Sequence, residues 1–286
     1  MRDLCRHRIG RNHGNSRFET GALRSYDAVP RQRTTRMSCD VDEAAARLRA
    51  GGDALELPLK SRLHGECLQS LVLRRARLQA PIFDHCEIRD SVFDGCDLSN
   101  ARFFGATRVQ SCRFTRVDFR SAGLNDTVFI DCSFIRCDFR GSHFDDCAME
   151  HSRFEACRIS GTRMHADRVR ACRFEGTLRD VHFIGSGQGS QLEADLSQCV
   201  LDDVSFEGCS LDRVIPPSEE HYLYLPDVGA RAQRALRSGT IDPARQALLL
   251  RRLRRYAQQQ GTIINVEQLR QIEGAELADA LLACLA

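Results

Sequence analysis

The 286-residue sequence contains no tryptophan, and it has only one lysine, Lys60, but 40 arginines. It has no apolar run near the ~20 residues that a membrane-spanning helix needs, which argues against an integral membrane protein. It also has no Cys-x-x-Cys pair with the spacing of a zinc site, no glycine-rich phosphate loop and no nucleophile motif. The net charge of +2 favours neither nucleic acid nor protein as a partner. We therefore expect neither an enzyme nor a bound cofactor or metal.

Fourteen cysteines are present, a number that would suggest a disulfide framework in a small secreted protein. Ten of them instead share one position of the five-residue pattern described next: Cys86, Cys96, Cys112, Cys132, Cys137, Cys147, Cys157, Cys172, Cys199 and Cys209. Because side chains at that position are small, we predict buried free thiols that pack as small apolar groups. Free thiols are typical of a reducing compartment, which favours a cytoplasmic location.

A large apolar residue occupies every fifth position over residues 109–174, and a small residue stands two positions before most of them. The same pattern runs over 68–103, separated from the first block by one extra residue near Ala106, and it resumes over 196–211 after a break. A five-residue period fits neither the 3.6-residue period of a helix nor the two-residue period of a long strand. The 28 units that we count therefore indicate a repeat architecture.

Units such as Cys-Asp-Phe-Arg-Gly at 137–141 and Ala-Asp-Leu-Ser-Gln at 194–198 resemble the pentapeptide-repeat family. The family consensus is a small residue, Asp or Asn, Leu or Phe, and two variable residues, and the resemblance covers about 66–213. It implies a right-handed quadrilateral β-helix with four pentapeptides in each coil. We thus predict an all-β solenoid of about seven coils, roughly 30 Å long at the strand spacing of about 4.8 Å. The family shares a shape and not an activity.

In such a coil the central apolar residue and the small residue before it point inward, and the other three residues point outward. Large side chains then fill the bore, and the small position avoids overpacking. The predicted structural core includes eight phenylalanines: Phe114, Phe119, Phe129, Phe134, Phe139, Phe144, Phe154 and Phe174.

The sequence divides into four predicted parts. Residues 1–40 are predicted to be a disordered basic tail or targeting segment, because the first 36 positions contain nine arginines and only three acidic residues. Residues 41–65 form a helical cap and a lead-in, 66–214 form the β-helix with a loop near 185–191, and 215–286 form a helical region.

Helix signals in the C-terminal region predict four helices. They cover 228–238, 242–260, a stretch from 265 to a break at Gly274, and 275–285. Asp followed by Pro at 242–243 is typical of a helix start, and glycine is typical of a helix end.

Three outward surfaces are candidates for interaction. The first is the glycine-rich loop after Phe183, with Gly185, Gly187, Gln188 and Gly189. The second is a column of aspartates 20 or 21 residues apart, Asp97, Asp118 and Asp138, beside Arg120 and Arg140. The third is the basic side of the 242–260 helix, with Arg251, Arg252, Arg254 and Arg255, which is either a solvated face, a homodimer seam or a site for an acidic partner.

Two further columns place Asp145 beneath His165 and Asp131 beneath His151. An aspartate over a histidine could bind a metal or act as a base. Each pair lacks a third ligand, however, and a flat face has no pocket to exclude water. Exposed ion pairs are the better interpretation.

We predict a non-enzymatic protein-interaction scaffold whose partner is a protein of unknown identity. The alternative follows from resemblance to the quinolone-resistance pentapeptide proteins, which are taken to mimic DNA and bind a type II topoisomerase such as gyrase. Over 66–213 the net charge is only −4. Duplex DNA as long as the predicted rod, roughly 30 Å, carries roughly 17 negative charges. A further alternative is a secreted bacterial effector, which the basic tail suggests.

Overall fold

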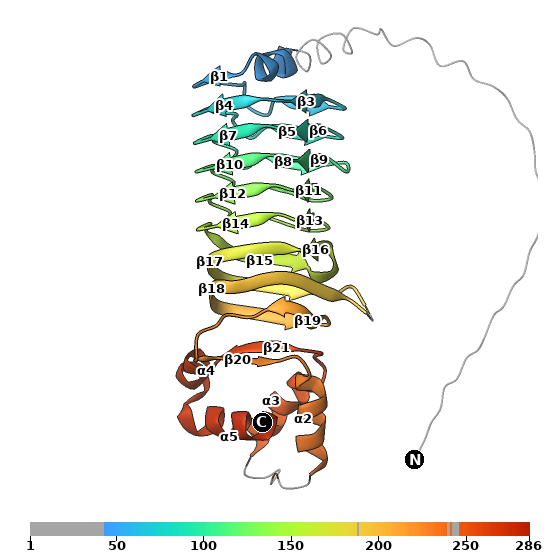
Figure 1. Ribbon diagram of the computed structural model, residues 1–286, viewed down its shortest axis with the longest axis vertical. Helices are drawn as coiled ribbons and strands as arrows, with labels where there is room; N and C mark the ends of the chain where they lie inside the picture. The colour runs from blue at the N-terminus through green and yellow to red at the C-terminus, as the bar shows by residue number, and fades with distance from the viewer. Residues whose placement is uncertain (1–42, 188, 239–240, 242–245) are drawn as a thin grey trace, which may run out of the picture.

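The computed structural model describes residues 43–187, 189–238, 241 and 246–286. Over these residues the chain is an elongated stack of coils, with a helical segment at one end and a small helical module at the other (Figure 1). The predicted tail over 1–40 lies outside the described residues. Within the part of the chain that the structure describes, no helix is long and apolar enough to cross a bilayer.

The coils present four faces, three of which are parallel sheets. The largest sheet contains, in order, β1 (Gly52–Asp53), β4 (Val72–Arg74), β7 (Val92–Asp94), β10 (Arg113–Thr115), β12 (Ser133–Ile135), β14 (Arg153–Glu155), β17 (Cys172–Ile184), β18 (Gln191–Glu207) and β19 (Ser210–Ile215), with β15 (Ile159–His165) paired to β17. The second contains β3 (Cys67–Gln69), β6 (Glu87–Arg89), β9 (Arg108–Gln110), β11 (Val128–Ile130), β13 (Ala148–Glu150) and β16 (Val169–Arg170), which follows the short 3-10 helix η1 (Ala166–Arg168). The third contains β2 (Arg62–His64), β5 (Ile82–Asp84) and β8 (Arg102–Phe104). The fourth face is a ladder of isolated bridges through Glu56, Arg77, Asp97, Asp118, Asp138 and Arg158.

This arrangement is a right-handed quadrilateral β-helix, and it confirms the predicted fold class. The stack has about eight coils, where about seven were expected. The additional coil lies at the N-terminal end, where β1 already pairs with β4. Its buried residues Leu57 and Leu63 are six positions apart. The five-residue spacing is therefore interrupted in this coil, and the sequence pattern does not reveal it.

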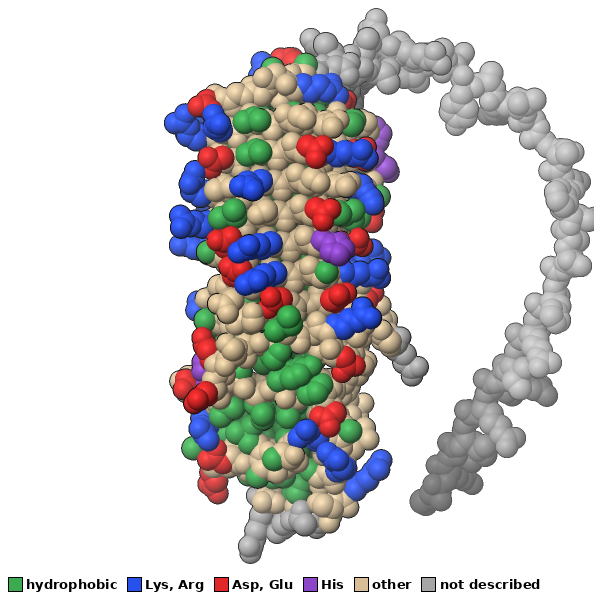
Figure 2. All heavy atoms as spheres, viewed as in Figure 1, with side chains coloured by type: hydrophobic (Ala, Val, Ile, Leu, Met, Phe, Trp, Pro, Cys, Tyr) green, Lys and Arg blue, Asp and Glu red, His purple; other side chains and the backbone are tan. Residues whose placement is uncertain are grey.

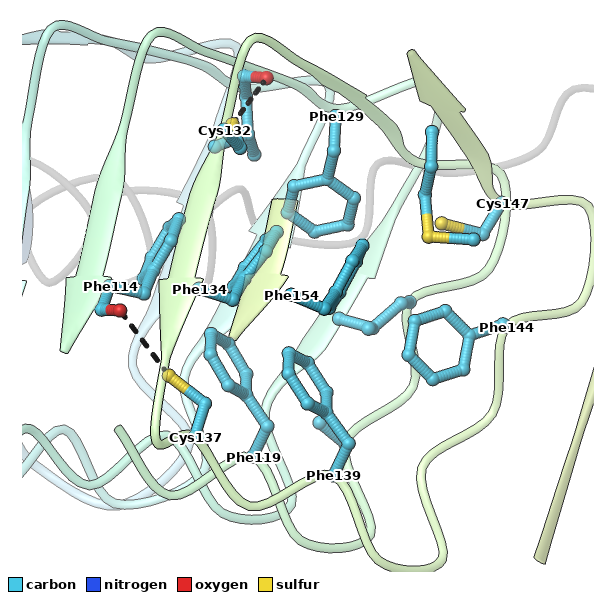
Figure 3. Close-up of a cluster of buried hydrophobic side chains, with 14 of the residues drawn as sticks. Phe114, Phe119, Phe129, Cys132, Phe134, Cys137, Phe139, Phe144, Cys147 and Phe154 are labelled. Atoms are coloured by element: carbon cyan, nitrogen blue, oxygen red, sulfur yellow. Dashed lines mark hydrogen bonds between the residues drawn. The ribbon is translucent and has the colours of Figure 1, made fainter. Parts of the chain in front are cut away.

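Phenylalanine rings from successive coils stack into columns inside the rod (Figure 3). Phe114, Phe134 and Phe154 form one column with nearly parallel rings, whose centroids are 4.9 Å and 4.7 Å apart. Phe119 and Phe139 stack 4.8 Å apart in a second column. These spacings match the separation of neighbouring strands, about 4.8 Å, because each ring follows its own coil. All eight phenylalanines predicted as core are at most 2% exposed.

The residue two positions after most inward residues turns a corner of the coil. It adopts a left-handed backbone, with φ of +54° at Arg136, +56° at Asp146 and +67° at Gly141. Non-glycine residues take this conformation infrequently. Gly105 and Ala106 are both left-handed, at +65° and +57°. The six-residue step between the two sequence blocks is thus absorbed at a corner, where it does not displace the inward side chains.

The twelve described cysteines are free, and the ten at the small position are all buried. At the N-terminal end, residues 43–50 are helical, and Ala44, Ala45 and Leu48 are buried in the same core as the coils. This helix covers the outer edge of the first coil, which would otherwise offer unpaired backbone groups to another strand.

The C-terminal module combines a strand pair with four helices. Strands β20 (Tyr222–Leu225) and β21 (Thr262–Asn265) are antiparallel. The helices are α2 (Val228–Arg237), α3 (Ala247–Tyr256), α4 (Val266–Glu273) and α5 (Ala275–Leu285). The Asn265 side chain caps α4 by accepting a hydrogen bond from the Gln268 backbone N–H at 3.0 Å.

Two features of this module differ from the sequence prediction. The helix expected over 242–260 is described only as α3, which ends at Tyr256 because the chain then turns toward β21; residues 242–245 lie outside the described residues. The strand pair was not expected, since each strand is short and its partner is distant in sequence. The strand pair forms because β20 is hydrogen-bonded to the end of the rod. The Tyr222 hydroxyl accepts from the Leu201 backbone N–H at 2.9 Å, and the Tyr224 hydroxyl donates to the Leu211 carbonyl at 2.7 Å. The pair thus covers the last coil.

Candidate interaction surface

An open groove lies where the last coil meets the C-terminal module, with a volume of about 290 Å³. Residues 203–206 of β18 form one side, and Tyr256, β21 and residues 268–273 of α4 form the other. Gln268 fixes α4 to the coil, because its Nε2 donates to Asp202 Oδ1 at 3.0 Å. The groove therefore lies at a hydrogen-bonded junction between the rod and the module.

Apolar side chains gather around this groove. Figure 2 shows them over the C-terminal part of the molecule, whereas the coils above carry alternating acidic and basic side chains. Ile272 lines the groove and is 68% exposed. Leu248, in the first turn of α3, is 63% exposed. Helix α4 has no fully buried residue.

Helix α5 is apolar around most of its circumference. Its residues 280–285, Ala-Leu-Leu-Ala-Cys-Leu, carry no side-chain charge. Three residues of the helix are fully buried, and four more of its apolar side chains are partly buried and pack against the core of the module: Leu277, Ala280, Leu282 and Cys284. A helix that is apolar all round is normally buried all round. Helix α5 therefore belongs to the core of the module, and the highly exposed apolar side chains lie on α3 and α4, at Leu248 and Ile272.

The four arginines of α3 divide into two kinds. Arg252 forms an ion pair with Glu273 of α4, and Arg255 Nη2 lies 4.0 Å from Glu207 Oε1 of the last coil. Both of these arginines line the groove. The other two are exposed and form no ion pair with another described residue: Arg251 and Arg254. Only half of the predicted basic face is thus available to an acidic partner.

The aspartate column lies on the fourth face, where backbone β-bridges join Asp97 to Asp118 and Asp118 to Asp138. Two of these carboxylates are held by arginines of their own coil. Arg120 Nε and Nη2 donate to both oxygens of Asp118 at 2.6–3.0 Å, and Arg140 holds Asp138 in the same way at 2.7–3.1 Å.

This pairing determines the charge of the column. The Arg140 guanidinium lowers the pKa of Asp138. Partial burial raises the pKa of Asp118, but hydrogen bonds from Arg120 outweigh it, and the pKa lies below its ordinary value. Backbone β-bridges also place an arginine next to each end of the column, Arg77 beside Asp97 and Arg158 beside Asp138. Two of the three aspartates are thus ion-paired, and the face is not an anionic strip.

Family comparisons agree with this architecture. Residues 72–107 match the family described as "Pentapeptide repeats (8 copies)", and residues 107–183 and 127–214 match "Pentapeptide repeat region". Together these matches span half of the chain. The chain belongs to the pentapeptide-repeat family. No curated protein matches it at a significant level.

Several solved structures are similar to this pentapeptide-repeat protein. A trypsin-treated form of QnrB1, described as a plasmid-mediated fluoroquinolone resistance protein, is 21% identical, with 54% of this chain and 86% of that chain covered and a TM-score of 0.36. HetL, a pentapeptide-repeat protein involved in heterocyst differentiation regulation in the cyanobacterium Nostoc sp. strain PCC 7120, is 15% identical, with coverages of 63% and 92% and a TM-score of 0.24. Rfr23 from the cyanobacterium Cyanothece 51142 is 10% identical, with coverages of 54% and 90% and a TM-score of 0.28.

The loop between β17 and β18 projects from the side of the pentapeptide-repeat rod (Figure 1). Gly185 is not at its tip: a Cβ there would lie 2.1 Å from the Gly208 carbonyl oxygen, so this glycine serves a close backbone contact. Gly187 faces open space, and Gly189 is left-handed at φ +85°. Gln188 lies outside the described residues. Among the loop residues predicted to interact, the described and accessible ones are therefore Gly187 and Gly189.

One cluster is missing from the sequence prediction. His64, Asp84 and His85 converge on the third face near the N-terminal end of the rod. Of the predicted Asp-over-His columns, His165 Nε2 lies 3.9 Å from Asp146 Oδ1 and not beside the aspartate one position earlier. The 20-residue step from His64 to Asp84 is the signal that could have revealed the cluster. The predicted repeat covers about 66–213, however, so its columns do not include His64.

Proposed function

We propose that this protein is a non-enzymatic interaction scaffold, in which the β-helix is a rigid rod and the C-terminal module carries the binding surface. The observation that carries the proposal is the exposed apolar surface of the module, where Leu248 and Ile272 are 63% and 68% exposed and Ile272 lines the groove under β18. The coils show mostly ion pairs, which are typical of solvated faces and contribute little to binding. Apolar side chains gathered at one end of a molecule are typical of a protein interface.

We take the partner at this surface to be a second copy of the chain. This exposed apolar surface is a permanent part of every molecule, so a permanent cover protects it from non-specific association. A second copy is always present in equal amount, and the same face on both copies can pair around a two-fold axis. Such a homodimer joins two rods through their C-terminal modules. It leaves the coils and the 185–190 loops of both rods free for other protein partners.

Sedimentation velocity of the full chain over a range of micromolar concentrations tests this proposal. The variant Leu248→Glu/Ile272→Glu places charges at two highly exposed positions of the module, and Val72→Glu is the matched control on β4 at the far end, where the side chain is 46% exposed. We expect the wild type and the control to sediment as dimers and the double variant as a monomer with an unchanged melting temperature. A monomeric wild type would contradict self-association, and a dimeric double variant would show that the interface does not lie at Leu248 and Ile272.

DNA mimicry with binding to gyrase has less support from the geometry. The net charge over 66–213 is −4, and the aspartate column consists largely of ion pairs. In a supercoiling assay with gyrase, run with and without a quinolone, we expect neither inhibition nor protection at micromolar protein. Inhibition that disappears in the variant Asp97→Asn/Asp118→Asn/Asp138→Asn would instead favour mimicry. The effector alternative depends on residues 1–36, which lie outside the described residues, and we do not propose it.

A further inference from the structure

Two histidines from adjacent coils converge on one buried carboxylate. His64 at the end of β2 is in register with Asp84 at the end of β5, and His85 follows at the corner. His64 Nδ1 lies 2.9 Å from Asp84 Oδ2, and His85 Nδ1 lies 2.6 Å from Asp84 Oδ1. One ligand-type atom from each of the three residues lies within 4.8 Å of the others. The Asp84 side chain is 4% exposed, whereas both histidine side chains are more than half exposed, so the cluster is anchored inside and open to solvent.

Gly105 in the next coil provides the space that His85 occupies. A Cβ at Gly105 would lie 2.4 Å from His85 Nδ1 and 2.7 Å from Asp84 Oδ1. The φ of Gly105 is +65°, but Ala80 and Ala106 occupy corners with φ of +56° and +57°. The backbone angle alone therefore does not require glycine here. Glycine is required because the His85 ring folds across the corner toward Asp84.

Arg62 is the cation that balances Asp84, and its Nη2 donates to Asp84 Oδ2 at 2.6 Å. This contact holds the pKa of Asp84 well below its usual range, against the opposing effect of burial, so the carboxylate is ionised. A carboxylate offers about four lone-pair sites, and Arg62 occupies one of them. The Arg62 side chain is 48% exposed, which leaves it free to turn toward solvent.

We propose that His64, Asp84 and His85 form a binding site for a divalent transition-metal ion, with zinc as the ion that fits best. The ligands are the two Nδ1 atoms and the Asp84 carboxylate, and water takes the remaining position on the open side. Zinc binds imidazole nitrogen and carboxylate oxygen at about 2.0–2.2 Å, which places tetrahedral ligand atoms roughly 3.3 Å apart. The two Nδ1 atoms lie 2.9 Å and 2.6 Å from the Asp84 oxygens, and one ligand-type atom of each residue lies within 4.8 Å of the others, so rotation of these side chains can bring the ligands to that spacing.

The site joins two coils, because His64 belongs to one coil and Asp84 and His85 belong to the next. Zinc that binds the folded chain and not the unfolded chain raises the melting temperature. Binding weakens as the pH falls, since a protonated imidazole cannot ligate a metal. Calcium prefers sites made entirely of oxygen ligands and is expected to have no effect. This inference is independent of the self-association proposed above.

Isothermal titration of the full chain with zinc, together with melting temperatures with and without zinc, tests the site. The variant His64→Ala/His85→Ala removes two ligands, and His143→Ala/His151→Ala is the matched control with two exposed histidines of the same rod. We expect the wild type and the control to bind one more zinc ion than the site variant and to gain thermal stability from it. Zinc bound elsewhere, including residues 1–42, is common to all three proteins and cancels in the comparison.

A second pair of variants tests the site without removing a ligand. Gly105→Ala pushes His85 away, whereas Gly141→Ala at a corner with φ +67° places its Cβ 3.8 Å from Ser121 Oγ, an ordinary contact. We expect Gly105→Ala to weaken zinc binding about 10- to 100-fold, the cost that loss of a supporting contact typically has, and Gly141→Ala to leave it unchanged. Equal zinc stoichiometry and affinity in the wild type and the His64/His85 variant would overturn the proposal. So would a calcium-induced stabilisation as large as that from zinc.

Discussion

Cys137 Sγ donates a hydrogen bond of 3.4 Å to the carbonyl oxygen of Phe114, the inward residue one coil earlier. Figure 3 shows this contact beside the phenylalanine columns. The same contact with the previous coil is made by other inward cysteines: Cys86, Cys96, Cys112, Cys132, Cys157, Cys172 and Cys199. Ser142 makes the equivalent bond to the Phe119 carbonyl at 2.7 Å. The small inward position thus supplies a donor between coils as well as a small volume.

We expect Cys137→Ala to destabilise the protein more than Cys137→Ser. Alanine removes both the sulfur and the donor, at a cost of about 1–2 kcal/mol. Serine keeps a donor in the geometry that Ser142 already shows, so its cost is smaller. The measurement is the free energy of unfolding by chemical denaturation. If alanine is the milder substitution, the thiol acts through packing and not as a donor.

The inward thiols are expected to resist alkylation in the folded protein. Burial raises the pKa of Cys172 to about 12 and that of Cys209 to about 11, so very little thiolate forms at neutral pH. Among the cysteines that the structure describes, Cys67 is exposed and is expected to react first with iodoacetamide, followed by the half-buried Cys284. Peptide mass spectrometry after timed labelling gives the rate at each position. Labelling of Cys172 as fast as Cys67 would show that the inward assignment is wrong.

Stability is expected to depend on pH through Asp138. Its folded-state pKa is lowered, chiefly by Arg140, so its contribution is present above the unfolded pKa of about 3.9 and is lost as the pH falls toward the folded value. We expect Asp138→Asn to lower the free energy of unfolding by roughly 1 kcal/mol at neutral pH. The difference from wild type is expected to shrink below about pH 4.

The control for this pH dependence is Asp145→Asn, because Asp145 forms no ion pair with another described residue. We expect it to follow the wild type at every pH. A deficit of Asp138→Asn that persists unchanged at about pH 3 would mean that the side chain stabilises the coil by packing or turn formation and not by its charge.

Two glycines of the 185–190 loop are expected to respond differently to one added methyl group. Gly185→Ala forces a Cβ against the Gly208 carbonyl and is expected to cost about 1–3 kcal/mol, because backbone on both sides must shift. Gly187→Ala points into open space and is expected to leave the melting temperature unchanged. Equal melting temperatures for the two variants would show that the Gly185–Gly208 contact is not close.

The core of the rod could be predicted from the sequence because its period directly encodes its geometry. Each inward residue, such as Phe134, repeats its surroundings one coil later at Phe154, so spacing alone gives position, direction and neighbours. The first coil was not predicted, because the six-residue step from Leu57 to Leu63 interrupts the five-residue spacing on which the prediction depends.

The groove and the strand pair depend on contacts between distant segments that have no common period. Leu223 of β20 pairs with Ile264 of β21 only because both strands meet the end of the last coil. Likewise, the Arg252–Glu273 ion pair arises from the packing of α3 against α4. Helix caps could be recognised locally, as at Asn265, but the packing of the capped helices could not.

The bidentate pairs Asp118–Arg120 and Asp138–Arg140, with closest contacts of 2.6 Å and 2.7 Å, also determine how the rod acts on molecules at a distance. Opposite charges that close together cancel over little more than a Debye length, about 8 Å at physiological salt. A molecule approaching these coils therefore experiences little long-range attraction or repulsion. Association along this face is expected to proceed at the unsteered rate of roughly 10⁵–10⁶ M⁻¹ s⁻¹, and to change little with ionic strength.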